Sequence, residues 1–140
     1  MMGANIFFHS ECDFTLSEKD ARSTWIVKSI LNENKKVGEL NFIFCTDEYL
    51  LEKNIQFLDH DTYTDIITFD YCEEDVINGD VYISIERVLE NANIFGVSFE
   101  EELDRVLIHG VLHLAGYQDK NKEQGRTMRE KEDFYLSLRS

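Results

Sequence analysis

Four short stretches in the first 85 residues are rich in β-branched and aromatic residues, as β-strands are, and in Glu39–Thr46 apolar and polar residues also alternate. A period of two is typical of β-strands with one buried face. In the second stretch the alternation places Leu40, Phe42 and Phe44 on one face, which we expect to be buried. Asn78-Gly79 predicts a turn in the loop between the last two strands. The predicted strands are Asn5–His9, Glu39–Thr46, Thr64–Tyr71 and Gly79–Ile85.

Two stretches between these strands have the residue spacing of helices. In Ser17–Asn34, apolar residues recur three and four positions apart, as in an amphipathic helix. Ser17 and Asp20 have the spacing of a helix-capping box, so the helix is expected to begin at Ser17. Asp47–Lys53 is the second predicted helix of this half.

From residue 86 onward every predicted element is a helix. Glu86–Phe95 is followed by Gly96, and glycine readily adopts the left-handed conformation that ends a helix. Ser98 and Glu101 form a capping box that begins the next helix, which contains the chemical motif described below. A last helix, about Lys122–Leu138, alternates charges of both signs, as an exposed terminal helix does.

These elements predict a single α+β domain spanning residues 1–140. A small sheet of about four strands would be covered by helices, and the C-terminal half would be rich in helix. The chain is 43% hydrophobic, which is enough for a core at this length. The order of the strands in the sheet does not follow from the sequence.

The formal net charge of −14 is distributed unevenly. Residues 47–104 carry seventeen acidic and two basic groups, whereas residues 1–46 and 105–140 are close to neutral. Bulk electrostatics therefore argue against a nucleic-acid binder, although a polyanion can approach the two flanks. We expect most of the carboxylates to form a solvated surface.

Cysteine usage and the lack of a targeting pattern favour a cytoplasmic protein. Cys12, Cys45 and Cys72 are odd in number and isolated, so neither a disulfide framework nor a cysteine zinc site is expected. The first ten residues lack the pattern of a secretory signal, and no stretch approaches the ~20 apolar residues of a membrane span. No membrane contact is expected, and the oligomeric state is not readable.

The residues that carry chemistry lie in the segment HGVLHLAGYQD, which begins at His109. Side chains four positions apart lie on one face of a helix, so His109 and His113 point at the same spot. Gly116 lets the chain reverse, and Asp119 can then return beneath the two histidines. Three such ligands leave one tetrahedral position open to water, which ionises near pH ~7 and attacks esters or phosphodiesters. We therefore predict one Zn²⁺ held by His109, His113 and Asp119.

Two other interpretations fit this segment less well. A lone helical histidine is usually a core or surface residue that makes a hydrogen bond, but two of the chain's four histidines occur here together. The spacing also resembles that of the metzincin proteases, H-E-x-x-H-x-x-G-x-x-H. Gly110 stands in place of their catalytic glutamate, so the proton acceptor for peptide hydrolysis is missing.

Three segments together resemble the YbeY family of bacterial rRNA maturation factors, described as metal-dependent endoribonucleases. The family signature H-G-x-L-H-L-x-G-Y is present at His109–Tyr117. Thr64–Phe69 is similar to the family's T-D/N-V-L-S-F strand, and Gly79–Ser84 to its G-D-I-x-I-S block. These blocks occur in the family's order and cover about residues 45–120. The resemblance implies a small mixed sheet with the histidine helix at its centre.

The resemblance also implies a function, namely single-strand endoribonuclease activity in 16S rRNA 3′-end maturation and ribosome quality control. Its partners would be an rRNA precursor and the small ribosomal subunit. An alternative of another class is a ribosome-assembly binding factor with a structural metal, which the acidic middle third favours. No general base is assigned. Asp65, Asp70 and Asp80, at strand ends, are candidates for orienting the metal ligands or for capping turns.

The sequence departs from the family pattern at two positions. Asp119 stands where the family usually has a third histidine, and a carboxylate remains a suitable zinc ligand. Leu58 occupies the position of a family arginine that would contact phosphate, and His60 is a weaker, pH-dependent substitute. Four basic residues near the last helix are further candidate phosphate contacts, or part of a solvated face: Lys120, Lys122, Arg126 and Arg129.

Overall fold

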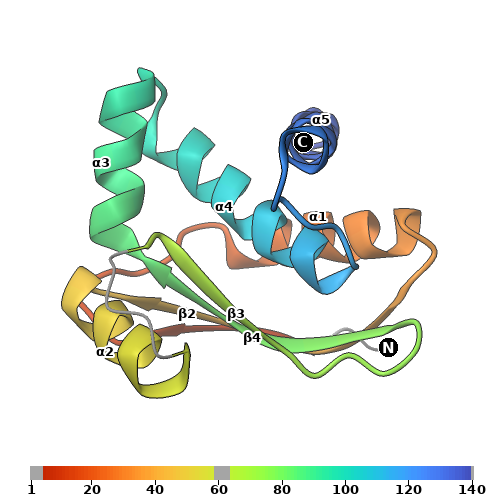
Figure 1. Ribbon diagram of the computed structural model, residues 1–140, viewed down its shortest axis with the longest axis horizontal. Coiled ribbons are helices and arrows are strands. Elements are labelled where there is room, and N and C mark those ends of the chain that lie inside the picture. The colour runs from red at the N-terminus through yellow and green to blue at the C-terminus, as the bar shows by residue number, and fades with distance from the viewer. Residues whose placement is uncertain (1–4, 59–63, 140) are drawn as a thin grey trace.

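The computed structural model describes residues 5–58 and 64–139, which form four strands and five helices. Figure 1 shows the sheet at the base, with α1, α4 and α5 over one face and α2 against the other face at one end. This arrangement confirms the predicted α+β class. In chain order the elements are β1 (Asn5–Ser10), α1 (Lys19–Asn32), β2 (Lys36–Cys45), α2 (Asp47–Leu58), β3 (Ile66–Asp70), β4 (Val76–Ser84), α3 (Ile85–Phe95), α4 (Phe99–Leu114) and α5 (Lys122–Leu136).

The four strands form one mixed sheet in the order β1-β2-β4-β3. β2 runs parallel to both β1 and β4, and β3 is an antiparallel edge strand beside β4. The predicted turn at Asn78-Gly79 is wrong, because both residues lie inside β4. The Asn78 side chain accepts a hydrogen bond of 2.8 Å from the backbone amide of Glu39. Glu39 lies where the pairing register of β2 with β4 shifts. The chain turns instead at residues 71–75, where Glu74 has a φ of 52°.

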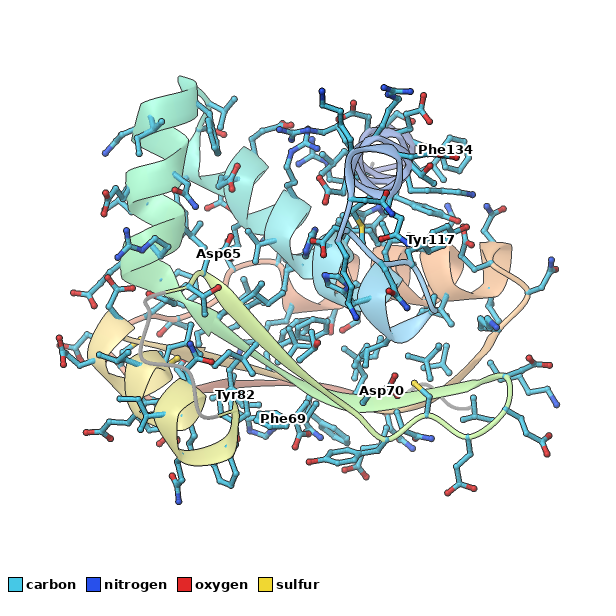
Figure 2. All side chains as sticks on the ribbon, viewed as in Figure 1. Asp65, Phe69, Asp70, Tyr82, Tyr117 and Phe134 are labelled. Atoms are coloured by element: carbon cyan, nitrogen blue, oxygen red, sulfur yellow. The ribbon has the colours of Figure 1, made fainter. Side chains whose placement is uncertain are left out.

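The main core lies between the sheet and the helices above it. Leu40, Phe42 and Phe44 are fully buried there, as the alternation predicted. A smaller apolar cluster fills the space between α2 and the opposite face of the sheet. Phe69 and Tyr82 pack against this cluster and lie below the sheet in Figure 2. The sheet therefore holds α4 firmly on one side while α2 covers part of the other.

The capping signals around α3 and α4 are confirmed. Gly96 ends α3 with a left-handed φ of 68°. The Ser98 hydroxyl accepts a hydrogen bond of 3.1 Å from the Glu101 amide and so begins α4. These two signals set the start of α4, whose apolar residues are buried along most of its length.

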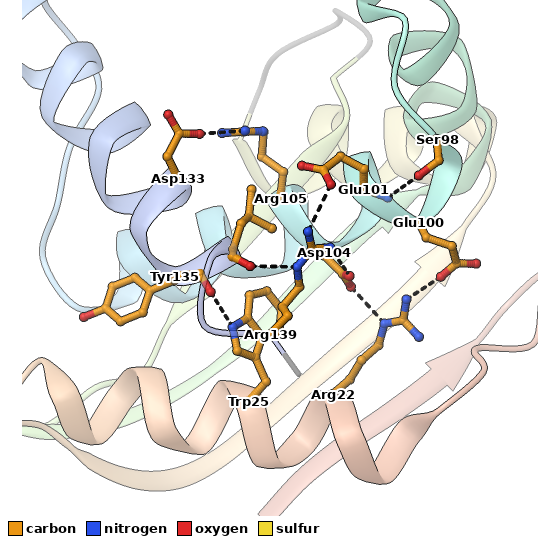
Figure 3. Close-up of polar contacts among 11 residues, drawn as sticks. Arg22, Trp25, Ser98, Glu100, Glu101, Asp104, Arg105, Asp133, Tyr135 and Arg139 are labelled. Atoms are coloured by element: carbon orange, nitrogen blue, oxygen red, sulfur yellow. Dashed lines mark hydrogen bonds and ion pairs between the residues drawn. The ribbon is translucent and has the colours of Figure 1, made fainter.

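The predicted capping box of α1 is wrong. The helix begins after Glu18, whose backbone is left-handed at a φ of 51°, and no side chain caps it. Its first turn is held by Arg22, which donates a hydrogen bond of 2.6 Å to the Ser17 carbonyl. The Arg22 Nε donates to Asp104 of α4 at 2.9 Å, and Arg139 donates to the same carboxylate at 2.8 Å (Figure 3). This buried ion network joins α1, α4 and the chain's C-terminal segment.

The last helix is less exposed than its charge pattern predicted. One face of α5 packs against α4, because apolar residues recur on that face among the charges. A carboxylate also lies on this buried face, and it belongs to the site described next. No helix in the described part of the chain is long and apolar enough to cross a membrane. The buried residues of α5 are Met128, Glu132, Tyr135 and Leu136.

Candidate metal centre

The three residues predicted to bind metal come together at the C-terminal end of α4. The Nε2 atoms of His109 and His113 lie 3.5 Å and 3.4 Å from the same oxygen, Oδ2 of Asp119. One ligand atom from each residue lies within 4.8 Å of the other two. Gly116, with a φ of 108°, reverses the chain after the helix and brings Asp119 back toward the histidines. Local sequence spacing thus produces a converging set of two nitrogens and one oxygen.

These separations fit a tetrahedral cation. Ligand atoms about 2.0–2.1 Å from a tetrahedral zinc are separated from one another by about 3.3 Å. The two nitrogen–oxygen distances are close to that value. The imidazole rings stand nearly perpendicular, at 85°, with centroids 4.5 Å apart, and the Nε2 atom of each lies beside the Asp119 oxygen. The donor set is therefore suited to a small divalent ion with one position left open.

A backbone carbonyl fixes the orientation of His113. Its Nδ1 lies 3.0 Å from the Tyr117 carbonyl oxygen. A carbonyl oxygen can only accept, so the proton must reside on Nδ1. The Nε2 lone pair of the neutral ring is then directed at the site, as a metal ligand requires.

A side chain from α5 fixes the orientation of His109. Its Nδ1 lies 2.6 Å from Oε2 of Glu132, which is only 5% exposed. The second oxygen of Glu132 accepts a hydrogen bond of 2.9 Å from Arg105. Burial by itself would lower the pKa of His109, but the hydrogen bond and charge of Glu132 outweigh it and the pKa is raised. A carboxylate–histidine pair of this kind makes the imidazole a stronger ligand.

Glu132 was not predicted from the sequence. The charges of α5 were interpreted as solvated, yet Glu132 shares a helix face with Met128 and Tyr135, which are buried. An acidic residue at helical spacing within an apolar face is the signal that identifies it, because a buried carboxylate needs a partner.

Two of the three candidate ligands, His109 and Asp119, line a cleft of about 380 Å³, whose floor is α4 and whose walls include residues of α3 and α5. Asp65, one of the three aspartates proposed to orient ligands, lines this cleft, and burial raises its pKa although the charge of His109 opposes the shift. Asp70 and Asp80 lie near the opposite end of β3, as Figure 2 shows for Asp70. They accept hydrogen bonds from the Cys72 amide and from Asn41, respectively, and so have local structural roles.

The residues proposed as phosphate contacts differ in whether they line the cleft. Arg129 lines the cleft, whereas the cleft lining does not include Lys120, Lys122 or Arg126. His60 and the side chain of Leu58 lie outside the described residues.

Gly110 faces the sheet rather than the cleft. A Cβ atom at this position would lie 2.9 Å from Val81 and 3.1 Å from Ile66. A glutamate side chain there would be directed into the core and away from the ligand atoms. The structure therefore gives a packing reason for the glycine and offers no position here for a metzincin-type base.

Nearly the whole chain matches known proteins. The family model for Endoribonuclease YbeY matches residues 9–139. The chain belongs to the YbeY family. The Endoribonuclease YbeY of Flavobacterium psychrophilum is 56% identical over 133 residues, which cover 95% of each chain. That of Christiangramia forsetii is 50% identical over 138 residues, covering 99% of this chain and 96% of the relative.

A solved structure has a similar fold. The solution structure of TM1509 from Thermotoga maritima is 33% identical and has a TM-score of 0.68. The match covers 94% of this chain and 87% of that one. The three candidate ligands and Glu132 all lie within the residues that the YbeY model matches.

Proposed function

We propose that this member of the YbeY family is a zinc-dependent endoribonuclease that cleaves single-stranded RNA during 3′-end maturation of 16S rRNA. Endoribonuclease activity follows from membership of the family. The observation that supports metal dependence is the convergence of His109, His113 and Asp119 on one point. Zinc is favoured because two imidazoles and a carboxylate at tetrahedral spacing suit it. The rRNA precursor, the small ribosomal subunit and a cytoplasmic location are parts of the same proposal.

The residues of the chain have distinct tasks in this hydrolysis. When bound, the cation would lower the pKa of a coordinated water and polarise a phosphoryl oxygen. Glu132 and the Tyr117 carbonyl hold the two imidazoles with their Nε2 lone pairs facing the site. Arg129 on the α5 wall carries a largely exposed guanidinium, which is suited to a phosphate group.

The charge of the cleft indicates that a bound cation would strengthen RNA binding. Two arginines line the cleft, Arg105 and Arg129, together with four carboxylates. Arg105 is already engaged by Glu132 and Asp133. A phosphate group would therefore be repelled from the cation-free cleft, so we expect chelation to weaken RNA binding as well as to abolish cleavage. The four carboxylates are those of Asp65, Glu102, Asp119 and Glu132.

The test is cleavage of an rRNA precursor that contains the 3′ end of 16S rRNA, with zinc-loaded and chelated protein. His113→Ala and Asp119→Ala should remain folded by circular dichroism and lose most cleavage. His9→Ala changes an exposed histidine of β1 and is the matched control, which should cleave normally.

Two results would overturn the proposal. Cleavage that persists in His113→Ala without metal would exclude a metal-dependent reaction at this site. Unfolding of both ligand variants and of the chelated protein, with no cleavage by the folded zinc form, would instead favour the ribosome-assembly factor with a structural metal.

A further inference from the structure

The wall of the cleft opposite α5 carries an exposed aromatic ring. Phe95 is the last residue of α3, and it lines the same cleft as His109 and Asp119. Its exposed fraction is 57%. Asn91, one helical turn earlier, lines the cleft beside it. The ring and an amide are thus presented together on the wall that faces the metal ligands.

Packing of the fold does not account for this ring. α3 buries Val88 and Ala92 against the rest of the domain, and Phe95 is outside that buried face. Among residues 5–58 and 64–139, Phe95 has no ring–ring or cation–π contact, whereas Phe134 and Phe57, which are exposed to a similar degree, each contact another ring. The helix ends directly after it, at Gly96, so the ring stands at the rim of the cleft.

We infer that Phe95 is a base-stacking residue that holds an unpaired nucleotide of the RNA substrate over the cleft, an inference that rests on the proposed function. Single-stranded RNA is bound by stacking its bases on exposed aromatic rings while cations hold its phosphates. In this cleft the ring lies on the α3 wall and the Arg129 guanidinium on the α5 wall, with the metal ligands on α4 and the loop that follows it. A nucleotide lying across the cleft would place its base against Phe95 and its phosphate toward Arg129 and the metal centre.

This arrangement also selects the strandedness of the substrate. A base in a duplex is paired and stacked within the helix, so its face is not available to Phe95. The Asn91 amide offers both a donor and an acceptor to the edge of an unpaired base. The stacking residue therefore contributes a preference for single strands that a bound metal ion, which would contact only phosphate and water, cannot supply.

The neighbouring residue provides a matched control. Ile94 is 66% exposed and adjoins Phe95 on the same helix, but it does not line the cleft. Phe95→Ala and Ile94→Ala therefore remove similar amounts of exposed apolar surface, and both should leave the free energy of unfolding nearly unchanged.

The experiment measures binding of zinc-loaded protein to a short single-stranded RNA with phosphorothioate linkages, by fluorescence anisotropy. Phe95→Ala should bind roughly tenfold more weakly, since stacking of one base is worth about 1–3 kcal/mol. Phe95→Trp should restore binding, and Ile94→Ala should bind like the unmodified protein. An oligonucleotide of abasic residues with the same backbone should bind the unmodified protein and Phe95→Ala equally.

The outcomes separate this inference from the function on which it rests. If the unmodified protein cleaves the rRNA precursor but Phe95→Ala binds RNA as tightly as Ile94→Ala, the stacking role is wrong and the proposed function stands. Equal losses for the base-containing and abasic oligonucleotides would also overturn stacking. If the unmodified zinc-loaded protein neither binds nor cleaves RNA, the proposed function itself fails.

Discussion

Replacing Glu132 with glutamine tests whether α5 tunes the metal centre. The substitution preserves the size of a side chain that is 5% exposed but removes its negative charge. At 2.6 Å from Nδ1 of His109, the carboxylate makes the imidazole more basic and keeps its proton on Nδ1. A glutamine amide that donates to Nδ1 would instead move that proton to Nε2, the atom that faces Asp119.

The expected effect of Glu132→Gln is a 10- to 100-fold loss of zinc affinity, which is the usual cost of removing a partner that orients a metal-binding histidine. This corresponds to about 1.4–2.8 kcal/mol. Arg105 loses one of its two carboxylate partners but keeps Asp133 at 2.7 Å, so the fold should persist. Zinc affinity is measured by competition with a chromophoric chelator, at constant pH and ionic strength.

Glu130→Gln is the control, because Glu130 is an exposed residue of the same helix. It removes the same charge from α5 without touching His109. If Glu132→Gln and Glu130→Gln bind zinc equally well, the carboxylate–histidine pair has no role in metal binding. An unfolded Glu132→Gln protein would be detected by circular dichroism before the titration, and Glu132→Asp would then test the same contact with the charge retained.

Three further predictions concern the fold. Gly110→Ala should lower the melting temperature by about 3–10 °C, because its Cβ would lie 2.9 Å from Val81, whereas Gly125→Ala, with nothing within 4 Å, should not lower it. Arg22→Ala should lower the free energy of unfolding, measured in urea, by about 3 kcal/mol. The reason is that the buried Asp104 loses one ion-pair partner and keeps Arg139 as the remaining one. A loss as small as that of Arg126→Ala would refute this. Burial would raise the pKa of Glu33, but hydrogen bonds from Tyr135 and Tyr117 and the charge of Lys131 outweigh it and lower that pKa. The stabilisation from this carboxylate is therefore present above the unfolded pKa of about 4.3 and lost as the pH falls through the folded pKa. The stability difference between the unmodified protein and Glu33→Gln should be constant from pH 6 to 8 and shrink below about pH 4.5, and a widening difference on acidification would contradict the assignment.

The elements set by local spacing could be predicted from the sequence. Leu40, Phe42 and Phe44 revealed a buried strand face, and Ser98 revealed the start of α4. The convergence of the candidate metal ligands was also predictable, since His109 and His113 lie four residues apart on a helix. Each of these features depends on residues that are close along the chain.

Features that depend on distant parts of the chain were missed. The strand order β1-β2-β4-β3 depends on pairing between segments separated by other elements. The capping box predicted at Ser17 is not formed. Arg22 instead donates hydrogen bonds to the Ser17 carbonyl and to Asp104 on α4, and these contacts hold the first turn of α1. Glu132 was missed because its partner, His109, lies 23 residues earlier on another helix. Tertiary contacts decided all three.

The two histidines of the metal centre differ in how easily mutation can disturb them. His113 relies on the carbonyl of residue 117, which almost any amino acid would supply while the turn at Gly116 persists. His109 relies on one carboxylate borne by a separate helix, so a single codon change at Glu132, or detachment of α5 from α4, removes its acceptor. Damage to the C-terminal helix should therefore misalign one ligand and leave the other in place, producing a protein that still captures zinc weakly through His113 and Asp119.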